Sequence, residues 1–324
     1  MKKAKVFFVV FLFLVGCLTV ISSSASAAFP ERPIEIIIPF GVGGGSDTAA
    51  RALAEGMKPL MKVPLVLTNM PGGAATKGML HVSQQPADGY TVLGITTSNL
   101  IDAVKPKTRA HLLRDFDPIM RYQWDTSAVS ISGTSQFKTI AELIDWGKKN
   151  PRLLKFAGTS PKGWSEIQTV GFFNRVGVEA TFVPFESGAE IKAAILGGHI
   201  HGAVEEIAET LPLIQAGKLR SLAVISEKRH PALPDVPCTK ELGLDYTHGL
   251  MRGMAVKKGT PPDRAKYIHD VMKQALEAPI YKKFVEENHL YARPGYLGPE
   301  DSRKYWDEEV AFYTEILKSA GYVK

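Results

Sequence analysis

The sequence predicts an α/β protein of two doubly wound domains that are joined by crossover strands. Three observations carry this prediction. Short apolar runs of strand type alternate with segments of helical period from residue 34, the same alternation starts again at residue 128, and a strand-like run returns at 250–256. Alternating strands and helices are typical of sheets with helices on both faces. We expect residues 29–125 and 252–324 to form domain 1, and residues 126–251 to form domain 2.

Residues 1–28 have the layout of a secretory signal peptide. Three lysines precede an apolar run that ends at Val15, and small residues follow it. This run is too short for a comfortable transmembrane helix. We therefore expect cleavage after Ala27 or Ala28 and a periplasmic protein. Because residues 14–17 resemble a lipobox, a lipid anchor at Cys17 is the alternative.

Composition excludes several classes of protein. Loss of the three signal-peptide lysines lowers the formal net charge of +6 by three, and no cluster of basic and aromatic residues argues for nucleic-acid binding. Cys238 is the one cysteine outside the signal, so no internal disulfide is possible and the core must hold the fold. The mature chain of roughly 300 residues suits two domains of ordinary size.

A glycine-rich loop follows the first predicted strand, Ile34–Ile38. Three consecutive glycines, at 43–45, allow a sharp turn and a close approach of a ligand to the backbone. Ser46 and Asp47 are expected to cap a helix that begins near Thr48. The free N–H groups at such a helix start suit an anion.

The ligand of this loop is better read as a carboxylate than as a nucleotide phosphate. A P-loop needs a lysine followed by Ser or Thr, whereas this loop ends Gly45, Ser46, Asp47. The dinucleotide fingerprint needs Gly or Ala at the position of Ser46, and an acid where Asn69 follows the next strand. A tight turn without any ligand is the structural alternative.

Further elements follow along the chain. Strands are predicted at 64–68, 90–95, 128–132, 153–157, 181–185, 199–204, 222–226 and 250–256. Helices are predicted at 75–84, 189–196, 262–276, 280–288 and 299–320. One further helix is predicted to begin at residue 139, and another to end at residue 173. Polar residues 96–99 stand at the carboxyl end of the third strand, where ligands of such sheets bind. In the last helix, Trp306, Val310, Tyr313 and Leu317 share one face and are expected to pack on domain 1.

Several segments together give a resemblance to a known family. They are residues 29–34, 39–47, 69–73, 87–91, 183–185, 196–198, 217–220 and 234–237. In their order and spacing the chain resembles the periplasmic solute-binding proteins of tripartite tricarboxylate transporters, the TctC or Bug family. The resemblance implies a type II periplasmic-binding fold that closes like a flytrap on a small carboxylate. It also implies membrane permease subunits as partners, no cofactor, and a monomer.

Loops that line the cleft in relatives, together with the residue types, give the predicted ligand-binding residues. They are Phe40, Gly43, Gly44, Gly45, Ser46, Asp47, Thr97, Ser98, Asn99, Thr159, Ser160, Lys162, Trp164, Ser165, Phe185 and Glu186.

Each half of this predicted site has its own task. One solute carboxylate is expected among the N–H groups of residues 43–47, with Ser46 and Ser98 as hydroxyl donors. Phe40 and Phe185 are candidates to cover an apolar body, with ordinary packing as their alternative role. Trp164 is a candidate to stack on a flat ring, and Lys162 to pair with a second carboxylate. Asp47 is expected to act as a helix cap rather than as a ligand contact.

Domain 2 departs from the family pattern. Relatives usually have a compact Gly/Ser motif followed by a histidine in the loop at 159–166, so Lys162 and Trp164 are unusual, and they often have Asp at the position of His201. Because these positions are expected to contact the distal end of the solute, the resemblance to the family does not identify the solute.

Two other functions are weighed against solute transport. No catalytic constellation is present in the sequence, and the best metal candidate is His199, His201 and Glu205, on the expectation that alternate strand residues share a face. This set supports a metal-binding or hydrolytic enzyme only weakly. A periplasmic ligand sensor for a signalling partner is the other alternative.

Overall fold

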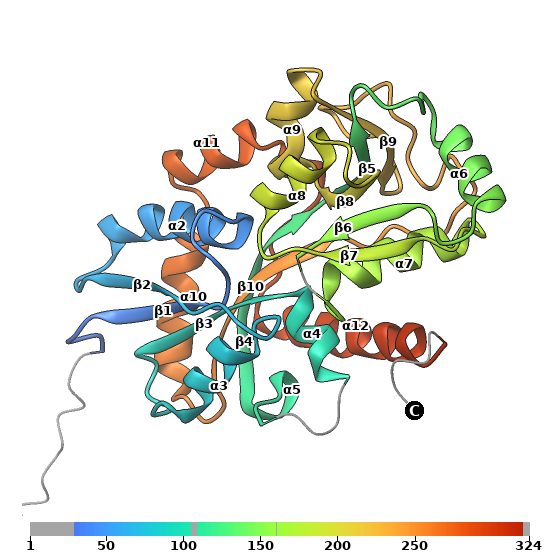
Figure 1. Cartoon of the computed structure of the whole chain (residues 1–324). Helices are drawn as coiled ribbons and strands as arrows, with labels where there is room; N and C mark the ends of the chain where they lie inside the picture. Colours follow the sequence, from blue (N-terminus) through green and yellow to red (C-terminus); the bar gives the residue numbers. More distant parts are fainter. Residues whose placement is uncertain (1–28, 105–108, 160, 320–324) are drawn as a thin grey trace, which may run out of the picture.

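A computed structural model describes residues 29–104, 109–159 and 161–319. The signal peptide and the lipobox cysteine predicted for residues 1–28 therefore lie outside the described residues. The described chain forms two α/β lobes (Figure 1). None of the described helices combines the length and the apolar character that a membrane span requires.

The first lobe contains a five-stranded mixed sheet. In sheet order its strands are β2 (Leu65–Asn69), β1 (Ile34–Ile38), β3 (Thr91–Thr96), β10 (Leu250–Lys257) and β4 (Phe116–Asp125). β1 is parallel to β2 and β3, whereas β10 is antiparallel to β3 and β4. The ten-residue strand β4 was not predicted from the sequence.

The second lobe repeats this plan. Its strands, in sheet order, are β7 (Thr181–Pro184), β6 (Lys155–Gly158), β8 (Gly202–Glu206), β5 (Ser127–Ser132) and β9 (Leu219–Ile225). β6 is parallel to β7 and β8, and β5 is antiparallel to β8 and β9. β4 ends where β5 begins, and β10 returns from the second lobe to the first sheet. The residue limits of the two domains stay a prediction.

Helices cover both sheets. The first lobe carries α2 (Gly45–Met57), α3 (Thr76–Gln84), α4 (Thr97–Ala103), α5 (Leu112–Asp115), α10 (Pro262–Ala275), α11 (Pro279–Glu287) and α12 (Pro299–Ser319), with short 3-10 turns η1 (Lys58–Leu60) and η2 (Leu290–Ala292). The second lobe carries α6 (Ile140–Lys149), α7 (Trp164–Arg175), α8 (Gly188–Leu196) and α9 (Ile207–Gln215).

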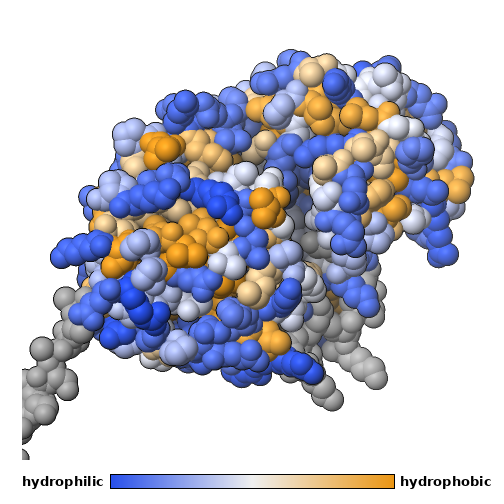
Figure 2. All heavy atoms as spheres, turned by 60° about the vertical axis from the view of Figure 1, so that its left-hand side comes forward, coloured by the Kyte–Doolittle hydropathy of each residue, from blue (hydrophilic) through white to orange (hydrophobic). Residues whose placement is uncertain are grey.

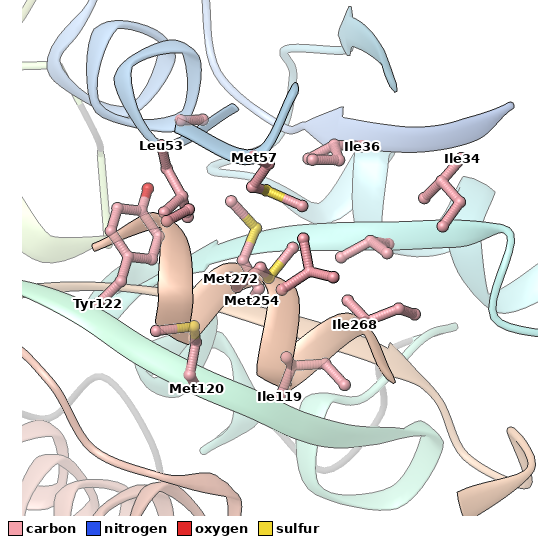
Figure 3. Close-up of a cluster of buried hydrophobic side chains, with 14 of the residues drawn as sticks. Ile34, Ile36, Leu53, Met57, Ile119, Met120, Tyr122, Met254, Ile268 and Met272 are labelled. Carbon is pink, nitrogen blue, oxygen red and sulfur yellow. The ribbon is translucent and has the colours of Figure 1, made fainter. Parts of the chain in front are cut away.

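Apolar faces hold the helices of the first lobe on its sheet. Side chains of α2, α10, β1, β4 and β10 meet in one buried cluster (Figure 3), in which Leu53 and Met57 of α2 approach Met272 of α10. A second cluster on the other face joins β1, β3 and α3 to Trp306 of α12. Trp306, Tyr313 and Leu317 are buried as predicted, whereas Val310 is half-buried. Tyr313 and Leu317 belong to a cluster that also contains Trp164 of the second lobe, so the last helix packs on both lobes.

Three local expectations were wrong. The helix expected near Thr48 begins at Gly45, and Gly44 at its N-cap gives no side-chain bond, so Ser46 and Asp47 are not N-caps. Residues 97–99, expected as a loop, open α4 because the side chains of Thr96 and Asn99 form a capping box. α9 was not predicted, since Pro212 within it breaks the usual helical pattern.

The carboxyl ends of the parallel strands decide where a site can form. β1 and β3 lead into α2 and α4, and β6, β7 and β8 lead into α7, α8 and α9. In sheets of this type ligands bind at this edge. Figure 2 shows the two lobes with a furrow between them, and contacts described below bring α9 against α2 across it.

Removal of the Trp306 side chain should destabilise the first lobe strongly. Trp306 is 1% exposed, and its replacement by alanine leaves a large cavity under α12. We expect Trp306→Ala to lower the free energy of unfolding by about 3–5 kcal/mol, measured by urea denaturation. The control is Glu308→Ala on the exposed face of α12, which should change it by less than about 0.5 kcal/mol. Equal effects of the two changes would contradict the packing described for α12.

Candidate functional site: an anion position between two lobes

The first part of the site is the start of α2. Gly43 takes a φ of +77°, which turns the chain out of β1 and into the helix. Asp47 stabilises this turn by accepting the N–H of Gly43 at 2.9 Å. Among the described residues no hydrogen bond uses the N–H groups of Gly45, Ser46 or Asp47. The helix therefore presents free donors and the positive end of its dipole.

Arg252 lies beside these donors. It stands on β10 opposite Thr96, the last residue of β3, and its side chain is only 3% exposed. Its guanidinium donates to Asp125 at 2.8 Å and to the hydroxyl of Ser46 at 2.6 Å. Because Ser46 accepts this bond, its own O–H remains available as a donor. The structure thus adds a buried cation to the helix start.

Glu209 reaches this position from the second lobe. It lies in the first turn of α9, and its Oε1 accepts from Arg252 at 2.9 Å. A Cβ on Gly45 would come within 1.9 Å of that oxygen, so the carboxylate rests directly on the first residue of α2. Only glycine leaves room for it. This contact joins the two lobes at the centre of the candidate site.

Further carboxyl groups surround the arginine. Asp125 is 2% exposed at the end of β4, and Gln123 donates to it at 2.5 Å. Burial raises the pKa of Asp125, while Arg252 opposes this shift. Burial also works against the charge of Arg252, yet the carboxylates of Asp125 and Glu209 hold its pKa above the ordinary value. The arginine stays charged and the carboxylates are its counter-ions.

Two glutamates end strand β8 next to this group. Burial raises the pKa of Glu206 to about 7, and nearby Glu209 adds to the shift. Glu206 accepts the indole N–H of Trp164 at 2.9 Å. Burial raises the pKa of Glu205 to about 8, with Lys192 opposing the shift. Glu205 is 9% exposed, and its Oε2 has no hydrogen-bond partner among the residues that the structure describes. Near neutral pH both groups change charge easily.

The ligand-binding residues predicted in the first lobe lie at the same edge of the sheet, but the side chains of Asp47, Thr97 and Asn99 already bond to other groups of the protein. Asp47 is buried and bound by Arg51, Asn69 and the loop, and these hydrogen bonds keep its pKa low although burial alone would raise it. Thr97 accepts the N–H of Met251, and Asn99 belongs to the capping box of α4. Ser98 is buried, and Phe40 packs half-buried against the first core cluster.

Residues predicted from the second lobe are more dispersed. Thr159, Lys162 and Glu186 are exposed, whereas Ser165 and Phe185 are half-buried. Ser160 lies outside the described residues. Phe185 packs beside the cluster under α8, in agreement with its alternative packing role.

Trp164 has a different role from the one expected. It is 4% exposed and packs with Ile101, Leu250 and Tyr313 of the first lobe. Tyr313 lies edge-on to its ring at 6.5 Å. We therefore withdraw stacking on a flat solute, because the indole already packs between the lobes and positions Glu206.

The metal candidate does not assemble. His199 and His201 precede β8, whereas Glu205 lies near the far end of that strand. His201 accepts the N–H of Lys155 and packs against Trp146. No group of three or more metal-ligating side chains occurs among the described residues. The expected strand at 199–204 was placed about two residues too early, and this error made the histidines appear to share a face with Glu205.

Sequence reasoning missed the charged centre of the site. Arg252 stood inside an apolar run that was correctly read as a strand, and a buried arginine demands a carboxylate partner. Glu206 follows the predicted strand at 199–204 by two residues, and in the structure it ends β8. These two signals could have been used, but the pairing of Arg252 with Asp125 and Glu209 depends on contacts between residues far apart in the chain.

Comparison with known proteins bears on this arrangement. A Cupriavidus necator protein, described as a UPF0065 protein in the gbd 5′ region, is 26% identical over 91% of this chain and 90% of its own length. The solved periplasmic binding protein BugD is 26% identical, with a TM-score of 0.80 over 90% of this chain and 99% of that one. An R. palustris protein solved with adipate shares the fold, at 24% identity and a TM-score of 0.83 over 90% and 98% of the two chains.

A family model covers most of the described protein. It is the model of the tripartite tricarboxylate transporter family receptor, TctC, and it matches residues 49–322. This match begins inside α2, after Gly45, Ser46 and Asp47, and it includes Glu209 and Arg252. The receptors of this family are extracytoplasmic solute-binding proteins. The chain therefore belongs to the TctC family of solute-binding receptors.

Proposed function

We propose that this protein captures a small carboxylate between its two lobes and delivers it to the membrane permease subunits of a tripartite tricarboxylate transporter. The proposal combines the family with one feature of this chain. That feature is the free N–H groups at the start of α2 beside the guanidinium of Arg252.

The chemistry of this position favours a carboxylate. The N–H groups of Gly45, Ser46 and Asp47, the Ser46 hydroxyl and Arg252 offer only donors to an incoming group. Such donors bind a charged oxygen more strongly than a neutral one. Close carboxyl groups at Asp125 and Glu206 disfavour a second negative charge at the same point. A carboxylate with one charge therefore fits better than a doubly charged phosphate.

The far end of the solute would face the second lobe. Lys162 is exposed there, and we propose it as the partner of a second carboxylate. Phe40 offers a half-buried apolar surface in the first lobe. We propose a dicarboxylate or an aromatic carboxylate as solute, and the adipate bound by the R. palustris protein is consistent with the first class.

Export is part of the proposal. The predicted signal at residues 1–28 would place the receptor in the periplasm as a free monomer, with the lipid anchor at Cys17 as the alternative. We propose no reaction for it, since its family is one of solute-binding receptors.

The binding proposal is tested by calorimetry with succinate, adipate, malate and benzoate, each compared with its amide. We expect at least one acid to bind and its amide to bind far more weakly. Ser46→Ala should weaken binding of that acid about tenfold, because one donor to a charged oxygen is lost.

Thr48→Ala is the matched control. Its hydroxyl bonds to carbonyl groups of its own helix start, and the residue is exposed, so affinity should not change. Absence of binding by every acid, or an equal affinity for acid and amide, would contradict the proposed function.

Affinity should also fall as pH rises from 6 to 9. The solute carboxylate stays ionised over this range, but Glu206 and Glu205, with pKa values of about 7 and 8, become negative. New negative charges beside the bound anion should weaken binding roughly tenfold.

Titrations at pH 6 and pH 9 measure this effect, and Glu206→Gln should reduce it because the amide keeps the bond to Trp164 but cannot ionise. The same pH dependence of affinity in both proteins would show that ionisation of Glu206 does not weaken solute binding.

A further inference from the structure

Glu209 occupies the place where an anion is needed. The start of α2 and the guanidinium of Arg252 are both positive, and they lie against each other at Gly45, whose Cβ would come within 2.5 Å of the guanidinium. The Glu209 carboxylate lies on both of them, at 2.9 Å from Arg252 and in contact with the first residue of the helix. It stands at the position proposed for the carboxylate of the solute.

A solute carboxylate that binds while Glu209 still lies on Arg252 would meet electrostatic repulsion. Arg252 carries one positive charge, and Asp125 and Glu209 already supply two carboxylates to it. A third carboxylate at the same point would meet two like charges in a mostly buried space. Binding of the solute is therefore favourable only if one of the resident carboxylates moves away.

Glu209 is the partner that can leave. Its side chain is 28% exposed, whereas that of Asp125 is 2% exposed and is also held by Gln123. Glu209 stands in the first turn of α9, in the second lobe, so a separation of the two lobes would carry it away from α2. Asp125 would remain with Arg252 in either case.

We propose that Glu209 is an internal substitute for the solute carboxylate. In the empty receptor it ties the second lobe to Arg252 and α2, and the solute displaces it by offering its own carboxylate to the same donors. Glu209 thus sets the affinity of the site, because every solute must compete with it. This inference rests on the proposed function, and it assigns the competing group.

Removal of the competitor should strengthen binding. We expect Glu209→Ala to bind the best acid of the panel about tenfold to a hundredfold more tightly than the wild type, since no bond to Arg252 has to be given up. Glu209→Gln, which keeps the size but not the charge, should lie between the two. Glu227→Ala removes the same charge from an exposed position of the second lobe and should leave affinity unchanged.

Small-angle X-ray scattering gives a readout without any solute. Ligand-free Glu209→Ala should have a larger radius of gyration than the ligand-free wild type. With the acid bound, the two proteins should have the same radius of gyration. An affinity of Glu209→Ala equal to or weaker than that of the wild type would overturn the proposal, as would an unchanged radius of gyration.

These results separate the two proposals. If no acid binds either protein, the carboxylate function fails, whereas the scattering of the ligand-free proteins still decides whether Glu209 holds the lobes together. If acids bind both proteins equally, the function stands and the role of Glu209 as a competitor is wrong.

Discussion

The buried guanidinium of Arg252 is the interaction on which the site depends. A charge removed from water must be paired, and breaking such a pair is far more costly than breaking one at the surface. Asp125 supplies the permanent partner from the end of β4, and Ser46 and Glu209 complete the coordination from α2 and α9. Three segments far apart in sequence are therefore held at one point by one side chain.

This constraint explains several local features. Gly45 must lack a side chain because Glu209 and Arg252 pack on its backbone. Glu206 is placed next to the ion pairs by the indole of Trp164, which itself packs between the lobes. Burial then raises the pKa of Glu206 into the neutral range. An anion-binding site beside such groups is sensitive to pH and to the charge of its solute.

Much of the fold could be predicted from local patterns. The strand Ile34–Ile38, the return strand near residue 250 and the buried face of α12 all follow from apolar periodicity. The helix predicted from residue 139 is α6, with Thr139 as its N-cap. The anion-binding role of the glycine loop stays a prediction, and the start of its helix was misplaced by three residues. Arg252 and Glu209 were missed because their role arises from contacts between the lobes, which no local pattern encodes.

The central claim is that the donors at Gly45, Ser46 and Arg252 hold the carboxylate of the solute. A crystal structure of the receptor with its tightest-binding acid tests it most directly. The account predicts a carboxylate oxygen within hydrogen-bond distance of Arg252 and of the first N–H groups of α2, with Glu209 displaced from both. A solute bound elsewhere, with Glu209 still on Arg252, would contradict it.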